Sequence, residues 1–197
     1  MIWFHHAIPF ERIQYGEIIG CKEKSDDDFY LPAFEWLSGE VGFWPIFLAV
    51  GKPSDVYMTG YQNNWRRFLG HRAIYPKTGK MYFRKVYAKP MQNIVLFSFR
   101  HVEGVYTDYD AWHFALGAYG NRPQRELTKQ EHQQIFKKSW SQSRWHKLAE
   151  KQSYVQLVTG KLDLRTAYRV WVRNKATKKA LEKMGFKNVK IKRIPVG

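Results

Sequence analysis

Cysteine is almost absent from this chain, in which Cys21 is the only one. A single cysteine excludes an intramolecular disulfide, and it excludes a zinc site built from paired thiolates. Small proteins of oxidising compartments typically depend on disulfides. The sequence therefore predicts a protein that stays in a reducing compartment.

Long apolar runs are absent as well. No stretch approaches the roughly 20 apolar residues of a membrane-spanning helix, and no basic amphipathic helix dominates the sequence. The chain opens on Met1-Ile2-Trp3-Phe4 without the charged and apolar regions of a signal peptide. We expect a cytoplasmic protein with no membrane partner.

Acidic residues are absent from one long segment, Val56–Val102, which contains nine Lys and Arg in 47 residues. The net charge is −5 for residues 1–55 and +21 for residues 56–197, and the whole chain carries +16. A surface that mixes both signs would keep its net charge much smaller. The sequence therefore predicts a polyanionic partner, and nucleic acid is the first choice.

Aromatic residues lie between these cations, as stacking on exposed bases requires. We expect the cations to neutralise phosphates and the rings to stack on bases. The predicted nucleic-acid-binding residues are Arg66, Arg67, Arg72, Lys77, Lys80, Arg84, Lys85, Trp65, Tyr75, Tyr82 and Tyr87. A protein partner is the alternative. In that case the acidic first third of the chain packs against the basic surface or mimics nucleic acid toward another protein.

Two common catalytic motifs are missing. The chain has no Gly-x-x-x-x-Gly-Lys-Ser/Thr phosphate loop, which argues against a motor or a kinase. It has no Glu-x-Lys sequence either, which argues against the commonest metal-dependent nuclease core.

The candidate catalytic residues are Asp108, Asp110 and His113, with His5 as a fourth. The turn from Asp108 to His113 combines two carboxylates, an indole and an imidazole, which suit proton transfer. A helix cap is the simpler interpretation of the two acids, so no metal site is predicted. His5 and His6 are adjacent on an expected strand, and their rings should lie on opposite faces.

The pattern of apolar residues predicts an α+β fold: one domain over residues 1–197, with a mixed, largely antiparallel sheet and several packed helices. A subdomain seam is considered near residue 121. The expected strands are Ile2–Ala7, Trp44–Val50, Asn93–Phe99, Tyr154–Val158, Ala167–Val172 and Val189–Ile194. A hairpin is expected from His71–Tyr75 and Met81–Tyr87 around a Pro76–Gly79 turn.

Five helices are expected besides these strands. Thr128-Lys-Gln-Glu131 has the pattern of a capping box, and Asn174–Gly185 is expected to place Ala176, Ala180, Leu181 and Met184 inward. The other expected helices are Leu31–Leu37, Asp110–Tyr119 and Ser143–Lys151.

Three stretches together resemble an uncharacterised domain family of bacteria and their phages. They are Asn93–Phe99, Thr107-Asp-Tyr-Asp-Ala-Trp-His113 and Ile135-Phe-Lys-Lys-Ser-Trp140. The resemblance covers roughly residues 1–145, implies a bacterial or phage origin and implies no activity.

Two local resemblances imply group-transfer chemistry. Asn174-Lys-Ala176 with Leu181-Glu-Lys-Met-Gly185-Phe186 resembles the closing motif of GNAT acyltransferases. It implies that Asn174, Gly185 and Phe186 border acetyl-CoA. Phe4-His-His-Ala7, Ile13 and Gly16 resemble the opening of some ADP-ribosyltransferases, in which a strand histidine contacts the ribose of NAD.

Three classes of function remain open from the sequence. The first is a basic nucleic-acid-binding protein that acts on DNA or RNA or simply binds it. The second is a GNAT-like or ADP-ribosyltransferase-like transferase. The third is a phage interaction protein that inhibits a host factor.

Overall fold

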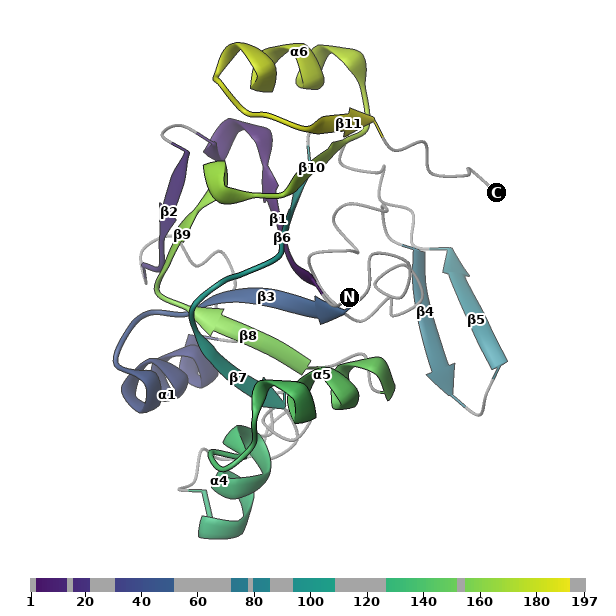
Figure 1. The fold of residues 1–197 in the computed structure, drawn as a ribbon. Helices are drawn as coiled ribbons and strands as arrows, with labels where there is room; N and C mark the ends of the chain where they lie inside the picture. The colour runs from purple at the N-terminus through teal and green to yellow at the C-terminus, as the bar shows by residue number, and fades with distance from the viewer. Residues whose placement is uncertain are drawn as a thin grey trace.

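The computed structural model describes residues 3–13, 16–21, 31–51, 72–77, 80–85, 94–108, 127–151 and 155–191, and at 31–33, 72–77, 80–85 and 94 it describes the backbone. A seven-stranded mixed sheet forms the centre of the fold, with helices packed on it (Figure 1). Two small two-stranded sheets accompany it. This arrangement confirms the predicted α+β class. The seam considered near residue 121 lies outside the described residues.

The central sheet is antiparallel at every strand pair except one. The parallel pair is β10 with β11, and helix α6 (Lys175–Lys183) connects them, as a parallel pair requires a crossover. The strand order is β11 (Val189–Ile191), β10 (Arg169–Val172), β6 (Ile94–Phe99), β1 (Trp3–Pro9), β3 (Ile46–Gly51), β8 (Val155–Thr159) and β7 (Val105–Asp108).

The first helix is longer than predicted. α1 is Leu31–Val41 and runs through Gly39, whereas the sequence predicted an end at Leu37. It stops at Gly42, which has a φ of +81° and donates its N–H to the Ser38 carbonyl at 2.9 Å. The left-handed conformation suits glycine, and it ends the helix.

The two helices that follow β7 agree with the sequence. α4 is Lys129–Phe136, and Thr128 and Glu131 form the predicted capping box at its start. α5 is Gln142–Lys151, one residue longer at its start than predicted. His132 of α4 contacts Glu40 of α1 at 2.6 Å, which links the two helices. The expected helix over Asp110–Tyr119 lies outside the described residues.

Helix α6 has capping groups at both ends. The Asn174 side chain accepts a hydrogen bond from the Thr177 N–H at 2.8 Å. At the other end, Gly185 has a φ of +87° and Phe186 donates its N–H to the Leu181 carbonyl at 3.0 Å, which is a Schellman motif. One part of the prediction is wrong: Ala176 is exposed and Thr177 is buried, because the inward face runs through Thr177 and Leu181.

The predicted hairpin is present as β4 (Arg72–Lys77) and β5 (Lys80–Lys85). Its turn is shorter than the four residues expected, because Pro76 pairs with Met81 and Lys77 pairs with Lys80. Proline lacks an N–H, but a two-stranded ribbon has an open edge on each strand where that donor is not needed.

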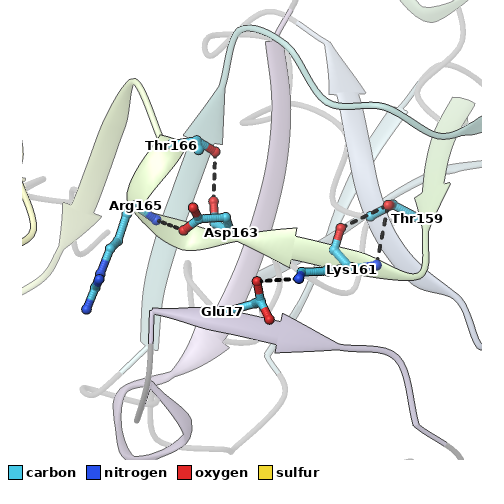
Figure 2. A network of polar contacts seen from close by, with 6 residues as sticks. All are labelled: Glu17, Thr159, Lys161, Asp163, Arg165 and Thr166. Carbon is cyan, nitrogen blue, oxygen red and sulfur yellow. Dashed lines mark hydrogen bonds and ion pairs between the residues drawn. The ribbon is translucent and has the colours of Figure 1, made fainter.

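The second small sheet pairs β2 (Glu17–Ile19) with β9 (Lys161–Asp163) in antiparallel fashion (Figure 2). β9 continues β8 through Gly160, where a Cβ would lie 2.9 Å from the Phe43 side chain. The Lys161 ammonium contacts the Glu17 carboxylate at 2.9 Å across the ribbon.

A short 3₁₀ turn, η4 (Leu164–Thr166), leads from this ribbon into β10. The Asp163 carboxylate accepts a hydrogen bond from the Arg165 N–H at 2.9 Å, and the Thr166 hydroxyl donates to the Asp163 carbonyl at 2.7 Å (Figure 2). These bonds fix the direction in which β10 begins.

Candidate functional site

The two faces of the central sheet differ in chemistry, because successive residues of a strand point to opposite faces. Phe4, Phe97 and Val170 belong to one buried apolar cluster, together with Trp145 of α5 and Leu181 of α6. We call this side the apolar face. The opposite side, which carries His5, we call the polar face.

The polar face carries a row of residues that are direct neighbours across six strands, which we call the polar row. His5 pairs with Ser98 and with Ala49, and Ala49 pairs with Gln156. The row is Arg169, Ser98, His5, Ala49, Gln156 and Thr107. Five of its six members are buried, Arg169 being half-buried. Four of the buried members are polar, and buried polar residues are uncommon in a sheet interior.

A hydrogen-bonded network holds the centre of the polar row. His5 Nδ1 lies 2.8 Å from Ser98 Oγ, and the Trp171 indole N–H donates to the same oxygen at 3.0 Å. His5 Nε2 lies 3.4 Å from the Gly51 carbonyl, which only accepts, so Nε2 carries the proton. In the neutral ring, Ser98 then donates to Nδ1. Both His5 and Ser98 are 0 % exposed, so this network orders the sheet centre.

Gln156 lies on the other side of Ala49 from His5 and is 8 % exposed. Its Oε1 is buried and accepts no hydrogen bond from any residue that the structure describes. A buried acceptor without a donor costs about 1–3 kcal/mol. Gln156 is therefore the member of the polar row with an unsatisfied hydrogen-bonding group.

An arginine–aromatic cluster lies at the Arg169 end of the polar row. It consists of Arg100, Arg169, Trp3, Tyr168 and Trp171. The Arg100 guanidinium lies 3.5 Å from the centre of the Tyr168 ring, and that of Arg169 lies 5.4 Å from it. Arg169 also lies 5.6 Å from the Trp3 ring, so its side chain leans across β6 toward β1.

Neither arginine of this cluster forms an ion pair with a carboxylate of the residues that the structure describes. Arg100 is exposed and Arg169 is half-buried. Two adjacent guanidiniums repel each other unless an anion lies between them. Aromatic faces hold guanidiniums in place without neutralising them. The cluster therefore holds two guanidiniums against aromatic rings, and no carboxylate of the described residues neutralises them.

Five of the predicted nucleic-acid-binding cations and two of the aromatics lie on the β4–β5 hairpin. The strand register places Tyr75 opposite Tyr82, Lys77 opposite Lys80, and Arg84 opposite Ala73. By alternation, these positions share one face of the ribbon. Arg72 and Lys85 form a pair on the other face. Arg66, Arg67, Trp65 and Tyr87 lie outside the described residues.

Asp108, one of the candidate catalytic residues, ends β7 and forms an ion pair. Its Oδ2 lies 2.7 Å from the Lys137 ammonium, and both side chains are mostly buried. Lys137 has a φ of +40° at the end of α4 and also donates to the Gln134 carbonyl. This pair ties α4 to the sheet. Asp110 and His113 lie outside the described residues, and no three His, Cys, Asp or Glu side chains gather as metal ligands in the described part of the chain.

His5, the fourth candidate, has a different neighbourhood from His6, as alternation predicts. His6 Nδ1 bonds to the Phe47 carbonyl at 2.9 Å, where β1 has parted from β3. Another histidine, His146, lies at the edge of the apolar face and bonds to a tyrosine. Its Nε2 is 2.9 Å from the Tyr106 hydroxyl. Burial raises the pKa of Tyr106 and lowers the pKa of His146.

The sequence did not single out Arg169, Tyr168, Trp171, Trp3, Ser98 or Gln156 as functional residues. Their local signal is weak, because Tyr168-Arg-Val-Trp171 has the alternation of any half-buried strand. Only pairing with β6 and β1 brings these residues together.

Asn174, Gly185 and Phe186, which the GNAT resemblance singles out, cap and close α6. Each of the three thus has a role in the fold of the described residues, and Phe186 also packs against Phe97.

Among the described helices, none is long and apolar enough to cross a membrane. No family model matches the chain, and no curated protein or solved structure matches it.

Proposed function

We propose that this protein binds nucleic acid. The observation that carries the proposal is the pair of guanidiniums, Arg100 and Arg169, that share the Tyr168 ring without a carboxylate partner in the described residues. Guanidiniums contact phosphates, and half-buried rings beside them offer faces for stacking. The net charge of +16 supports a polyanionic partner.

The β4–β5 hairpin supports the same proposal. Lys77, Lys80 and Arg84 share a face of the ribbon with the Tyr75–Tyr82 pair, and the Arg72–Lys85 pair belongs to the other face with Ile74, Phe83 and Met81. A ribbon that combines cations with aromatic residues suits contact with a phosphate backbone and its bases.

The test is the salt dependence of binding to duplex and single-stranded oligonucleotides. Each phosphate contact contributes about 0.9 to the slope of log K against log salt for duplex DNA. The double variant Arg100→Gln/Arg169→Gln should therefore flatten the slope by about 2. A second variant that neutralises Lys77, Lys80 and Arg84 should flatten it by a similar or larger amount.

Arg144→Gln is the matched control, because the Arg144 guanidinium also lies over an indole, that of Trp140, at 5.3 Å. It should leave the slope within about half a unit of the wild-type value. If the wild-type protein binds no oligonucleotide at low salt, or the double variant keeps both slope and affinity, the proposal is wrong.

One observation favours a second candidate, an ADP-ribosyltransferase-like enzyme that uses NAD. His5 lies on strand β1 and Gly16, with a φ of +73°, follows it; between them lies the three-residue 3₁₀ turn η1 (Phe10–Arg12), where the resemblance implies a helix. The burial of His5 and its bonds to Ser98 and Gly51 count against direct contact with a ribose.

Mass spectrometry of oligonucleotide and protein substrates incubated with NAD tests this candidate. Transfer that His5→Asn abolishes and the neighbouring His6→Asn retains would support it. Absence of any ADP-ribosyl adduct, together with no thermal shift of the wild type in NAD, would contradict it.

A further inference from the structure

The Arg100 guanidinium lies flat on an aromatic ring in the arginine–aromatic cluster. Its Cζ is 3.5 Å from the centre of the Tyr168 ring. Only a flat arrangement allows so short a distance, because an N–H that pointed at the ring would hold Cζ farther away. The N–H groups therefore point sideways, and one face of the guanidinium is turned away from the ring. Arg100 is exposed, so solvent reaches that outer face. We call this pair the Arg100–Tyr168 stack.

The surrounding residues hold the Arg100–Tyr168 stack in place. Trp3 meets the Tyr168 ring edge-on, with the two ring centres 4.9 Å apart. The Tyr168 carbonyl accepts a hydrogen bond from the Asn188 side-chain amide at 3.3 Å. Phe99, which directly precedes Arg100, has no exposed surface and anchors the backbone there. The Arg100 side chain is thus ordered before a ligand binds, which lowers the entropy lost on binding.

A flat cationic surface of this kind suits an unpaired base. Bases that are not in a helix stack on aromatic rings or on guanidinium planes, and every base has a flat face whatever its sequence. In a duplex, the neighbouring base pairs cover both faces of a base, and a protein reaches phosphates, sugars and base edges instead. The Arg100–Tyr168 stack therefore suits a single strand better than a duplex.

We infer that the Arg100–Tyr168 stack binds one unpaired base of a single-stranded nucleic acid. The base stacks on the outer face of the Arg100 guanidinium. The Arg169 guanidinium, 5.4 Å from the centre of the same tyrosine ring, binds a phosphate beside that base. The inference rests on the proposed nucleic-acid binding, and it adds the class of substrate, a single strand of any sequence.

Arg100→Lys tests the inference, because lysine keeps the positive charge and lacks the plane. The probes are a single-stranded oligodeoxythymidylate, a strand of the same length made of abasic sites, and the oligodeoxythymidylate paired with its complement. The wild type should bind the thymidylate strand about tenfold more tightly than the abasic strand, although both carry the same phosphates. Arg100→Lys should lose this preference, and its salt dependence and its affinity for the duplex should stay as in the wild type.

Two further variants separate stacking from charge. Arg169→Gln should flatten the salt slope for the single strand by about 0.7 and keep the preference for bases. Arg144→Lys is the matched control, since Arg144 is an exposed arginine whose guanidinium lies 5.3 Å from the centre of the Trp140 indole. It should keep both the slope and the preference. Arg100→Lys should melt within about 2 °C of the wild type, because it replaces an exposed side chain.

The outcomes distinguish the inference from the proposed function. Equal affinity of the wild type for the thymidylate and abasic strands, or a preference that survives Arg100→Lys, overturns the inference and leaves the proposed function standing. An equal loss of affinity for all three probes in Arg100→Lys also overturns the inference, because a lost phosphate contact would explain it. If the wild type binds none of the probes at low salt, the proposed function is wrong and the inference falls with it.

Discussion

The two faces of the central sheet are built from the same strands and serve different ends. On the apolar face, Phe4, Phe97 and Val170 pack against α5 and α6 as one continuous cluster. On the polar face, the neighbours His5 and Ser98 are equally buried but are joined by hydrogen bonds. Burial alone therefore does not identify the core that stabilises the fold. Both faces are closed to solvent at the sheet centre, and they differ there in what fills the buried space.

The largest expected effect comes from the apolar face. Phe97→Ala should lower the free energy of unfolding by about 3–5 kcal/mol, because it removes a ring with no exposed surface that contacts Phe99 and Phe186. Denaturant titration measures the loss. Ile19→Ala, at a site that is 63 % exposed, is the control and should cost less than about 0.5 kcal/mol.

The hydrogen-bonded network of His5, Ser98 and Trp171 gives the second largest expected loss of stability. Ser98→Ala removes the oxygen to which both the Trp171 N–H and His5 Nδ1 are hydrogen-bonded. We expect a loss of about 1–3 kcal/mol in the free energy of unfolding. Trp171→Phe combined with Ser98→Ala should cost less than the sum of the single changes. Additive losses would show that the two groups are not coupled.

The helix on the apolar face gives a smaller effect. Asn174→Ala should cost about 1 kcal/mol, because the Thr177 N–H loses its acceptor. Acetyl-CoA should shift the melting temperature of neither wild type nor variant if capping is the whole role of Asn174. A wild-type shift that the variant loses would instead support the GNAT resemblance.

The smallest effect is a dependence on pH. Burial lowers the pKa of His146 below its ordinary 6.5, so the unfolded chain binds a proton more readily than the folded protein. The stabilising contribution is therefore complete above pH 6.5 and is lost as the pH falls through the lowered folded pKa. Melting temperatures between pH 8 and pH 5 should fall less for His146→Gln than for the wild type. Parallel curves would contradict this assignment.

Local sequence patterns predicted the helices and strands well, but they did not predict the packing contacts between them. The continuous apolar run at Asn93–Phe99 predicted β6, and the box at Thr128–Glu131 predicted the start of α4. The end of α1 and the inward face of α6 were missed, because both depend on what the helix packs against.

The polar row was beyond prediction for a related reason. Ser98 and His5 are each unremarkable in a strand, and 93 residues separate them. Their partnership depends on the register between β1 and β6, which no short-range pattern specifies. The hairpin positions could be predicted because both strands and their turn are contiguous in the sequence.

The strand order also determines when the sheet is completed during synthesis. β1 emerges first, yet its neighbour β6 follows about 90 residues later, and Trp171 joins Ser98 across a further 73. Contacts so distant in sequence make folding slow, because the chain loses the entropy of loop closure before strand pairing stabilises it. Until β8 is made, β3 and β7 also lack their shared partner and present unpaired edges. A ribosome stalled before residue 155 would therefore hold a chain that is prone to pair with other chains.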